Sequence, residues 1–165
     1  NAGINQQMVK QALDFLDIQS ANIILDLFCG LGNFTLPMAE KAAQVTGIEG
    51  DEIMVNRAKE NALEQGITNT EYFASDLTDI DKTSSWMKQH YDKILLDPPR
   101  SGALEIVEQV KPMKASTIVY VSCQPPSLVR DSKGLWAAGY KMTHFGLMDM
   151  FPQTAHVESM AVFRK

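Results

Sequence analysis

Residues 26–34, which read Asp-Leu-Phe-Cys-Gly-Leu-Gly-Asn-Phe, decide the fold because they join an apolar run to a helical one. A strand is predicted over 23–28 and a helix over 34–43, so both glycines fall in the turn between them. Glycine lets the backbone approach a ligand closely, and open α/β sheets bind ligands beyond the carboxyl ends of their strands. The spacing Gly-x-Gly-Asn lacks the third glycine of the dinucleotide fingerprint, so a tight turn without a ligand remains an equal alternative.

Outward from this turn, short apolar runs alternate with helical segments. Helices are predicted over residues 6–16, 34–43 and 51–65. Strands are predicted over residues 23–28, 45–49, 70–74, 93–96, 117–122, 140–148 and 156–163. Continuous apolar strands with intervening helices indicate a mainly parallel sheet covered on both faces. Only residues 149–155 separate the last two strands, too few for a parallel crossover, so that pair is predicted to be antiparallel.

The bulk composition is that of one globular domain over residues 1–165. Hydrophobic residues make up 45% and charged residues 21%. No apolar run approaches the ~20 residues that span a bilayer, and the first residues lack the pattern of a signal peptide. Two cysteines do not make a disulfide framework, so we expect a reducing, cytoplasmic setting. The net charge of −5 argues against a domain that grips nucleic acid alone, because phosphate contacts need a basic surface.

Two acidic residues follow the next predicted strands. Glu49 ends the strand over 45–49, where a carboxylate can accept hydrogen bonds from both hydroxyls of a ribose. NAD sites use the same arrangement, so the glycine turn and Glu49 do not separate NAD from S-adenosylmethionine. Asp76 follows the strand over 70–74, where it can either meet an adenine edge or cap a helix. Both interpretations of Asp76 stay open.

Asp97 and Cys123 stand at the ends of the fourth and fifth predicted strands. Residues 97–100, Asp-Pro-Pro-Arg, form either a stiff loop in which Asp97 caps a turn, or part of a site at the sheet edge. Cysteine is more often a small buried hydrophobe than a nucleophile. At a strand end beside a ligand, however, a partly exposed thiol can be activated, which favours Cys123 as a nucleophile.

Glu158 becomes interpretable from the predicted topology. If the last strand is antiparallel and inserts beside the fifth, its first residues lie at the edge where the parallel strands end. Glu158 would then face Cys123 across one strand spacing, roughly 5 Å. A thiol and a carboxylate base beside a methyl donor form a recognisable catalytic set. His156 either helps to orient this site or is an ordinary loop histidine, and the second interpretation is slightly favoured.

Five stretches, in this order along the chain, resemble the RNA 5-methyluridine methyltransferases. They are residues 26–34, 95–100 (Leu-Leu-Asp-Pro-Pro-Arg), 119–125 (Val-Tyr-Val-Ser-Cys-Gln-Pro), 149–152 (Asp-Met-Phe-Pro) and 156–159 (His-Val-Glu-Ser). The resemblance implies a Rossmann-like, S-adenosylmethionine-dependent methyltransferase fold with a mainly parallel seven-stranded sheet and one antiparallel strand near the C-terminus. The segments over 148–152 and 158–160 are more similar to the bacterial 23S ribosomal RNA branch than to the transfer RNA branch.

The same resemblance implies roles for individual residues. Cys123 matches the family's nucleophile and Glu158 its general base. The positions that match cofactor contacts are Phe28, Asn33, Glu49, Asp76 and Asp97. Many members also carry an N-terminal RNA-binding β-barrel and cysteines for an iron–sulfur cluster, so we expect much of the grip on RNA to lie outside these 165 residues. No metal site, membrane contact or obligate protein partner is expected in this chain.

Other functions remain as alternatives. RNA 5-methylcytosine methyltransferases tend to carry a second cysteine after the Asp-Pro-Pro turn, and amino-group methyltransferases favour an aromatic residue there, whereas this chain has Arg100. A transfer RNA substrate is the nearest alternative. A non-catalytic domain that binds S-adenosylmethionine or NAD is the alternative from another class, and it gives Cys123 no role.

Overall fold

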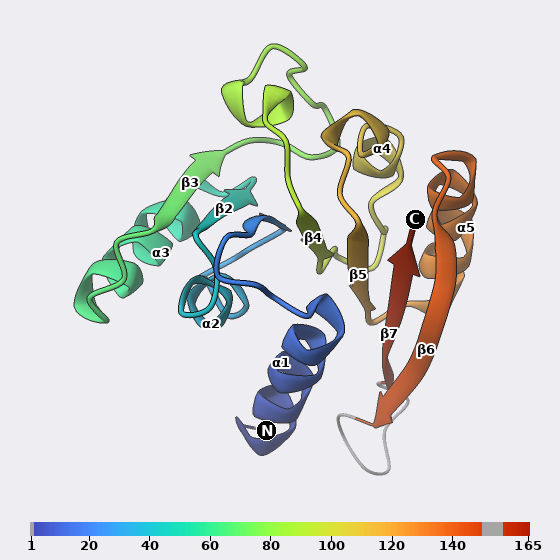
Figure 1. The fold of residues 1–165 in the computed structure, drawn as a ribbon, viewed down its shortest axis with the longest axis horizontal. Helices are drawn as coiled ribbons and strands as arrows, with labels where there is room; N and C mark the ends of the chain where they lie inside the picture. Colours follow the sequence, from blue (N-terminus) through green and yellow to red (C-terminus); the bar gives the residue numbers. More distant parts are fainter. Residues whose placement is uncertain (1, 150–156) are drawn as a thin grey trace.

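A computed structural model describes residues 2–149 and 157–165, and these residues form a seven-stranded sheet between two layers of helices (Figure 1). The strands are β1 (Ile23–Leu27), β2 (Gln44–Glu49), β3 (Thr70–Ala74), β4 (Lys93–Leu96), β5 (Thr117–Ser122), β6 (Lys141–Asp149) and β7 (Val157–Arg164). Their order is β3-β2-β1-β4-β5-β7-β6. All neighbouring pairs are parallel except those of β7, which runs antiparallel to both β5 and β6. The predicted fold class is confirmed.

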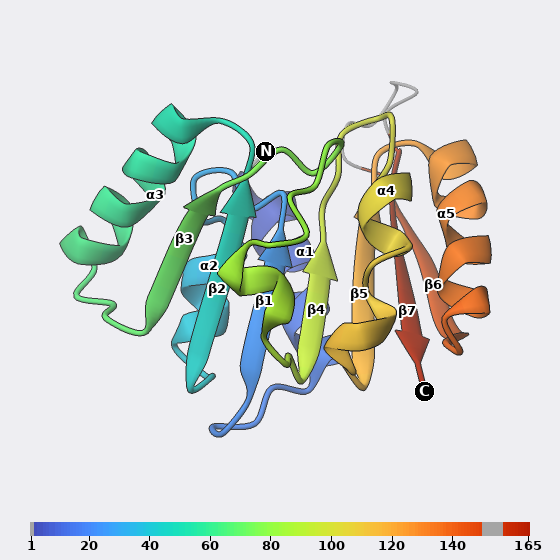
Figure 2. The same cartoon turned by 90° about the horizontal axis from the view of Figure 1, so that it is seen from above.

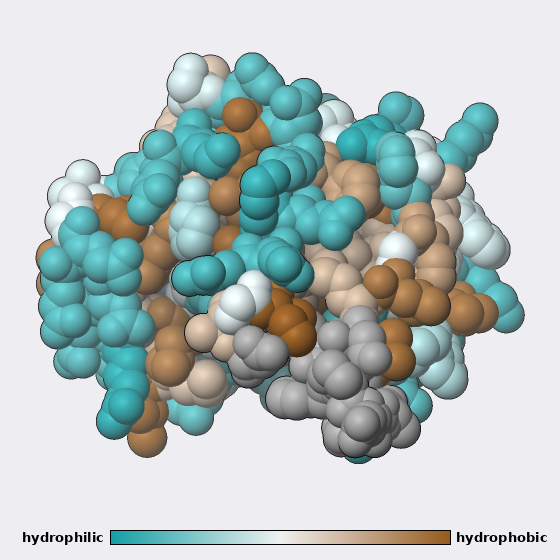
Figure 3. Space-filling model, turned by 90° about the horizontal axis from the view of Figure 1, so that it is seen from below, coloured by the Kyte–Doolittle hydropathy of each residue, from teal (hydrophilic) through white to brown (hydrophobic). Residues whose placement is uncertain are grey.

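The two faces of the sheet carry separate hydrophobic cores. Helices α1 (Ala2–Leu16), α2 (Thr35–Ala39) and α3 (Glu52–Glu64) cover one face (Figure 2). The other face is covered by α4 (Leu104–Val107), α5 (Pro125–Ala137) and the 3-10 helix η1 (Ser85–Lys88), with a second 3-10 turn, η2 (Lys111–Met113), before β5. Within the described residues no helix has the length and apolar character needed to cross a bilayer. Seen from the side of α1, the surface is mainly hydrophilic with smaller hydrophobic patches between (Figure 3), which is ordinary for a folded domain.

The helix predicted over 34–43 is shorter in the structure, and the reason lies elsewhere in the chain. Helix α2 ends at Ala39, and residues 40–43 form turns. The side-chain amide of Asn69 donates hydrogen bonds to the carbonyl oxygens of Ala39 and Ala42, at 2.8 and 3.1 Å. These carbonyls at the helix end are therefore satisfied without a further helical turn.

Helix α5 has no counterpart among the predicted segments, because the pair Pro125 and Pro126 after the predicted strand over 117–122 is typical of the end of a strand. Both prolines occupy the first turn of α5, where a missing N–H costs nothing and the fixed φ angle suits a helix. At the other end of the chain, α1 begins four residues earlier than predicted. The strands agree with the prediction to within one residue at each end.

The sheet order brings the ends of several strands that carry candidate site residues to one edge of the sheet. The parallel strands β1, β2, β4 and β5 all end there, and antiparallel β7 begins there. In the register of β5 with β7, Ser122 pairs with Ser159. Cys123 follows Ser122 and Glu158 precedes Ser159, so each of the two residues adjoins the last pair of this register in sequence. The predicted insertion of the last strand beside the fifth is thus confirmed.

Candidate active site

The turn after β1 is held in an unusual backbone conformation. Phe28, Gly30 and Gly32 have φ angles of +65°, +54° and +95°. Glycine adopts such angles readily, but a bulky residue such as Phe28 does so at a cost on the order of 1–3 kcal/mol. A strained, partly buried aromatic side chain at the end of a strand marks this turn as a candidate binding site, in line with the predicted role of Phe28.

Glu49 lies at the end of β2 and supports this turn. One carboxylate oxygen, Oε2, accepts a hydrogen bond from the backbone N–H of Gly30 at 3.0 Å. The other, Oε1, accepts from the N–H groups of Gly50 at 2.9 Å and Asp51 at 3.2 Å. Three backbone donors therefore fix the carboxylate beside the glycine turn, at the position predicted for a ribose acceptor.

Asp26 is a site residue to which the sequence analysis gave no role. Its side chain is fully buried, its Oδ2 accepts a hydrogen bond from the Thr35 hydroxyl at 2.5 Å, and its Oδ1 has no hydrogen-bond partner among the described residues. Burial, with the charges of Asp97 and Glu49, raises the pKa of Asp26 to about 7, although the hydrogen bond from Thr35 acts in the opposite direction. The available signal was an acidic residue in the middle of an otherwise apolar strand.

Asp97 directly follows β4, next to the glycine turn. Its backbone N–H donates to the carbonyl of Leu27 at 3.2 Å, which joins the ends of β4 and β1. Asp97 is partly buried, and this loss of solvent, followed by the charge of Glu158, raises the pKa of Asp97 to about 7. Asp97 therefore lies within electrostatic reach of both the turn and the β7 residue predicted to be the base.

Four acidic residues thus lie at or near the edge where the parallel strands end. Asp26 interacts electrostatically with Asp97 and with Glu49, and Asp97 interacts with Glu158. Like charges in a poorly solvated site repel, and a bound cation would relieve that repulsion. S-adenosylmethionine carries a sulfonium and an ammonium group, so these residues and the unpaired Asp26 Oδ1 fit such a cofactor. Among the described residues, no group of three or more His, Cys, Asp or Glu side chains could hold a metal ion.

Asn33 and Asp76 have other partners in the structure. Asn33 is exposed and exchanges two side-chain hydrogen bonds with Asn5 of α1, at 2.9 and 3.1 Å. Asp76 is exposed, and its Oδ1 accepts from the N–H and the hydroxyl of Thr78, at 2.8 and 2.7 Å. These bonds to Thr78 lower the pKa of Asp76. Asp76 therefore caps a turn and not a helix; the cofactor contacts of both residues stay predictions.

The two cysteines have opposite surroundings. Cys123 is exposed at the end of β5, whereas Cys29 is buried beneath the glycine turn. Burial, with the charges of Asp26 and Glu49, raises the pKa of Cys29 well above its usual range, so this thiol stays protonated and unreactive. Of the two thiols, only Cys123 is exposed, and its role as the nucleophile stays a prediction. Its predicted partner Glu158 is partly buried on β7 and pairs with Met148 of β6, while His156 lies outside the described residues.

The raised pKa of Asp97 makes the stability of the chain depend on pH. In the unfolded chain this group loses its proton near pH 4 and in the folded chain near pH 7, so its contribution to stability falls between these values. Asp97→Asn removes the charge, and its advantage in Tm should grow from pH 4 to pH 7 and then stay constant. Between pH 5 and pH 8 we expect a gain on the order of 2 kcal/mol, or roughly 4–8 °C in Tm.

Thermal unfolding of the two proteins across this pH range is the measurement. Asp79→Asn, at an exposed carboxylate three residues after Asp76, is the matched control and should show no such trend. An Asp97→Asn advantage that is the same at pH 5 and pH 8 would contradict the raised pKa of a partly buried Asp97.

Comparisons with known proteins agree with this geometry. The fold and the acidic edge beside a strained glycine turn define a Rossmann-like methyltransferase domain. The chain belongs to the tRNA (Uracil-5-)-methyltransferase family, whose model matches residues 1–165. Two similar relatives are named 23S rRNA (uracil(1939)-C(5))-methyltransferase RlmD: that of Stenotrophomonas maltophilia strain K279a, 51% identical, and that of Alcanivorax borkumensis, 52% identical. Each match covers 100% of this chain and 37% of the relative, so the chain spans little more than a third of these proteins.

Solved structures give the same picture. The tRNA (uracil-54, C5)-methyltransferase of Pyrococcus abyssi, in complex with S-adenosyl-L-homocysteine, is 27% identical with a TM-score of 0.83; the match covers 99% of this chain and 38% of that one. The magnesium protoporphyrin IX methyltransferase of Synechocystis PCC 6803, 16% identical, has a TM-score of 0.73 over 99% of this chain and 79% of that one. The second likeness is one of fold alone.

Proposed function

We propose that this chain is the catalytic part of an S-adenosylmethionine-dependent enzyme that methylates carbon 5 of a uridine in RNA. The observation that supports the proposal is the β5–β7 register, in which Ser122, the residue before Cys123, pairs with Ser159, the residue after Glu158. Ribosomal 23S RNA is favoured over transfer RNA, because the relatives named for 23S rRNA are 51–52% identical and the P. abyssi tRNA enzyme is 27% identical. Such an RNA-modifying enzyme would act in the cytoplasm.

The cofactor supplies an electrophilic methyl group. In this proposal Glu49 accepts hydrogen bonds from the ribose hydroxyls while it keeps the glycine turn in place. Phe28 offers an aromatic surface at the same turn, and the carboxylates of Asp26 and Asp97 stabilise the positive charges of the bound cofactor. Asn33 and Asp76 would have to share or exchange their present partners, Asn5 and Thr78, in order to contact it.

Cys123 is proposed to activate the uracil ring. Carbon 5 of uracil is a poor nucleophile and does not attack a methyl sulfonium unaided. When the Cys123 thiolate adds to carbon 6, the ring becomes an enolate, and carbon 5 can attack the methyl group. Covalent catalysis of this kind splits one difficult step into easier ones.

Glu158 is proposed to complete the reaction. After methyl transfer, carbon 5 carries both the new methyl group and its original hydrogen. The Glu158 carboxylate takes that proton, the electrons restore the double bond between carbons 5 and 6, and the Cys123 thiolate leaves. A positioned general base typically contributes ~10²–10⁴-fold to the rate.

The substrate must present a uridine outside a helical stack, because a stacked base cannot expose carbon 6 to Cys123. The net charge of −5 indicates that other parts of a full-length protein supply most of the RNA affinity. The iron–sulfur cluster found in many family members would also lie outside these residues.

The proposal is tested by offering the full-length protein unmodified 23S rRNA and tRNA transcripts with S-adenosylmethionine, followed by nucleoside mass spectrometry. We expect 5-methyluridine in 23S rRNA and none in tRNA. The appearance of 5-methylcytosine would favour the alternative reaction, and modification of tRNA alone would reverse the choice of substrate. No methylation of either RNA would favour a non-catalytic module.

Cofactor affinity gives a separate prediction. Glu49→Ala removes the proposed ribose acceptor and the support of Gly30, so S-adenosylmethionine binding should weaken by about 1–3 kcal/mol, the value of a hydrogen bond to a charged group. Isothermal titration calorimetry on both proteins measures the difference. Glu52→Ala, at the exposed first residue of α3, is the control and should bind as the wild type does. Equal affinity of Glu49→Ala and wild type would remove Glu49 from the site.

A further inference from the structure

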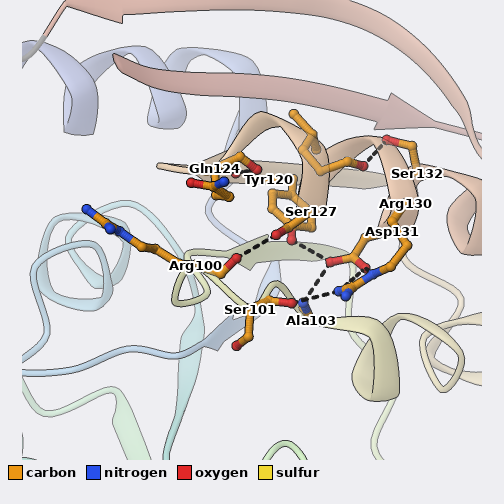
Figure 4. Close-up of polar contacts among 11 residues, drawn as sticks. Arg100, Ser101, Ala103, Tyr120, Gln124, Ser127, Arg130, Asp131 and Ser132 are labelled. Atoms are coloured by element: carbon orange, nitrogen blue, oxygen red, sulfur yellow. Dashed lines mark hydrogen bonds and ion pairs between the residues drawn. The ribbon is translucent and has the colours of Figure 1, made fainter. Parts of the chain in front are cut away.

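A polar network around a buried carboxylate joins helix α5 to β5 and to the loop after β4, and it lies outside the residues proposed to react (Figure 4). Its centre is Asp131, a fully buried carboxylate. The Oδ2 atom accepts from the Tyr120 hydroxyl at 2.6 Å and from the backbone N–H of Ala103 at 2.7 Å. The Oδ1 atom accepts from Nε and Nη2 of Arg130, at 2.9 and 2.7 Å. A buried carboxylate with four donors is well satisfied and rigid.

The same helix face holds the loop by its backbone carbonyls. Arg130 Nη2 donates to the carbonyl of Ser101 at 2.8 Å, and the Ser127 hydroxyl donates to the carbonyl of Arg100 at 2.5 Å. In Figure 4 the carbonyl of Arg100 points to Ser127 while its guanidinium points away from the network. Together with Asp131, which accepts from the N–H of Ala103, these residues bind three polar backbone groups of the loop.

The loop lies so close to the helix that it requires glycine at position 102. A Cβ atom there would come within 2.5 Å of Arg130 Nη2 and 2.6 Å of Asp131 Oδ2. Gly102 also has a φ angle of +82°, which residues with a side chain rarely adopt. The lack of room for a Cβ atom and the positive φ angle therefore both require glycine where the loop packs against this face of α5.

The network connects the two halves of the proposed site. The loop starts at Asp97, and α5 starts two residues after Cys123. Tyr120, on β5, lies three residues before Cys123. Burial and the contact with Asp131 raise the pKa of Tyr120 above its usual value, so the phenol remains a donor to the carboxylate. The segments that carry Asp97 and Cys123 are therefore tied to the same carboxylate.

We propose that Ser127, Arg130 and Asp131 are positioning residues for methyl transfer, which hold the loop carrying Asp97 in a fixed place relative to Cys123. This inference rests on the proposed function. None of the three is required to touch the cofactor or the RNA. Their effect is on the rate, because a displacement of about 1 Å at a reacting centre can cost ~10²-fold.

Ser127→Ala and Ser132→Ala are a matched pair for the test. Both serines lie on α5 and donate to a carbonyl, but Ser132 donates to Leu128 of the same helix, at 2.7 Å, and not to the loop. Alanine is a strong helix former, so both variants should fold. In the full-length protein, Ser127→Ala should lower kcat about ten-fold, with KM for S-adenosylmethionine within about two-fold of wild type. Ser132→Ala should keep the wild-type kcat.

Arg130→Lys is the second variant, since lysine keeps the charge but lacks the planar fork that bonds Asp131 twice and reaches Ser101. Hydrogen exchange of residues 97–103, measured by mass spectrometry, shows how firmly α5 holds this loop and does not depend on catalysis. Exchange should be about ten-fold faster in Ser127→Ala and Arg130→Lys and unchanged in Ser132→Ala.

The outcomes separate the two proposals. If wild type is active and both Ser127→Ala and Arg130→Lys turn over like Ser132→Ala, the positioning role is wrong and the proposed function stands. A lower Tm with unchanged kcat in the folded variants would equally reduce the network to a structural role. If the loop exchanges more slowly in wild type than in Ser127→Ala and Arg130→Lys, but the wild type methylates no uridine, the proposed function fails. The positioning role for that reaction then fails with it.

Discussion

Glu158→Gln in the full-length protein is expected to accumulate a methylated protein–RNA adduct with ordinary uridine. Glutamine keeps the size of the side chain and one carbonyl acceptor, but it cannot act as a base at neutral pH. Cys123 should therefore still add to carbon 6 and the methyl group should still transfer, after which elimination stalls. We expect turnover to fall by ~10²–10⁴-fold, the usual contribution of a general base. A denaturing gel with radiolabelled RNA measures the adduct, and mass spectrometry of the linked peptide identifies the methylated form.

The control for this variant is Glu71→Gln, at an exposed glutamate on β3 far from the β5–β7 pair, which should turn over normally without adduct. Normal turnover of Glu158→Gln would assign the proton to another group or to water. If neither adduct nor product forms, Glu158 acts before methyl transfer, for example in orienting the uracil.

Cys123→Ala is expected to abolish methylation entirely, because it removes the exposed thiol that is proposed to add to carbon 6. Cys29 cannot substitute, since it is buried and its pKa is raised. The double variant Cys123→Ala/Glu158→Gln should behave like Cys123→Ala alone, because the cysteine acts first. Cys29→Ala is the matched control and should retain the covalent chemistry. S-adenosylmethionine affinity should be unchanged in Cys123→Ala, which separates lost chemistry from a lost fold.

Local patterns in the sequence predicted most of the fold. Short apolar runs that alternate with helical segments predicted the strands, and the short connection before the last strand predicted its antiparallel direction. Helix α2 was predicted too long because Asn69, about thirty residues away, satisfies its final carbonyls. No periodicity within residues 34–43 carries information about that contact.

In the candidate site, too, some features could be predicted from the sequence and others could not. Positions at strand ends were predictable, so Glu49, Asp97 and Cys123 lie at the expected edge. The hydrogen-bond partners of the side chains were not predictable, because they come from distant segments. Asn33 pairs with Asn5, 28 residues away, and Asp131 accepts from the backbone N–H of Ala103, also 28 residues away. Pair contacts of this kind depend on tertiary packing, which a single sequence does not display.

The central claim is that Cys123 forms a covalent bond to carbon 6 of the target uridine, and one measurement tests it directly. RNA that carries 5-fluorouridine at the target is incubated with the full-length protein and S-adenosylmethionine, and the linked peptide is sequenced by mass spectrometry. Fluorine cannot be removed as a proton, so the covalent mechanism predicts a stable, methylated adduct on Cys123 that Cys123→Ala cannot form. A trap that survives Cys123→Ala, or an active enzyme that forms no trap, would contradict it.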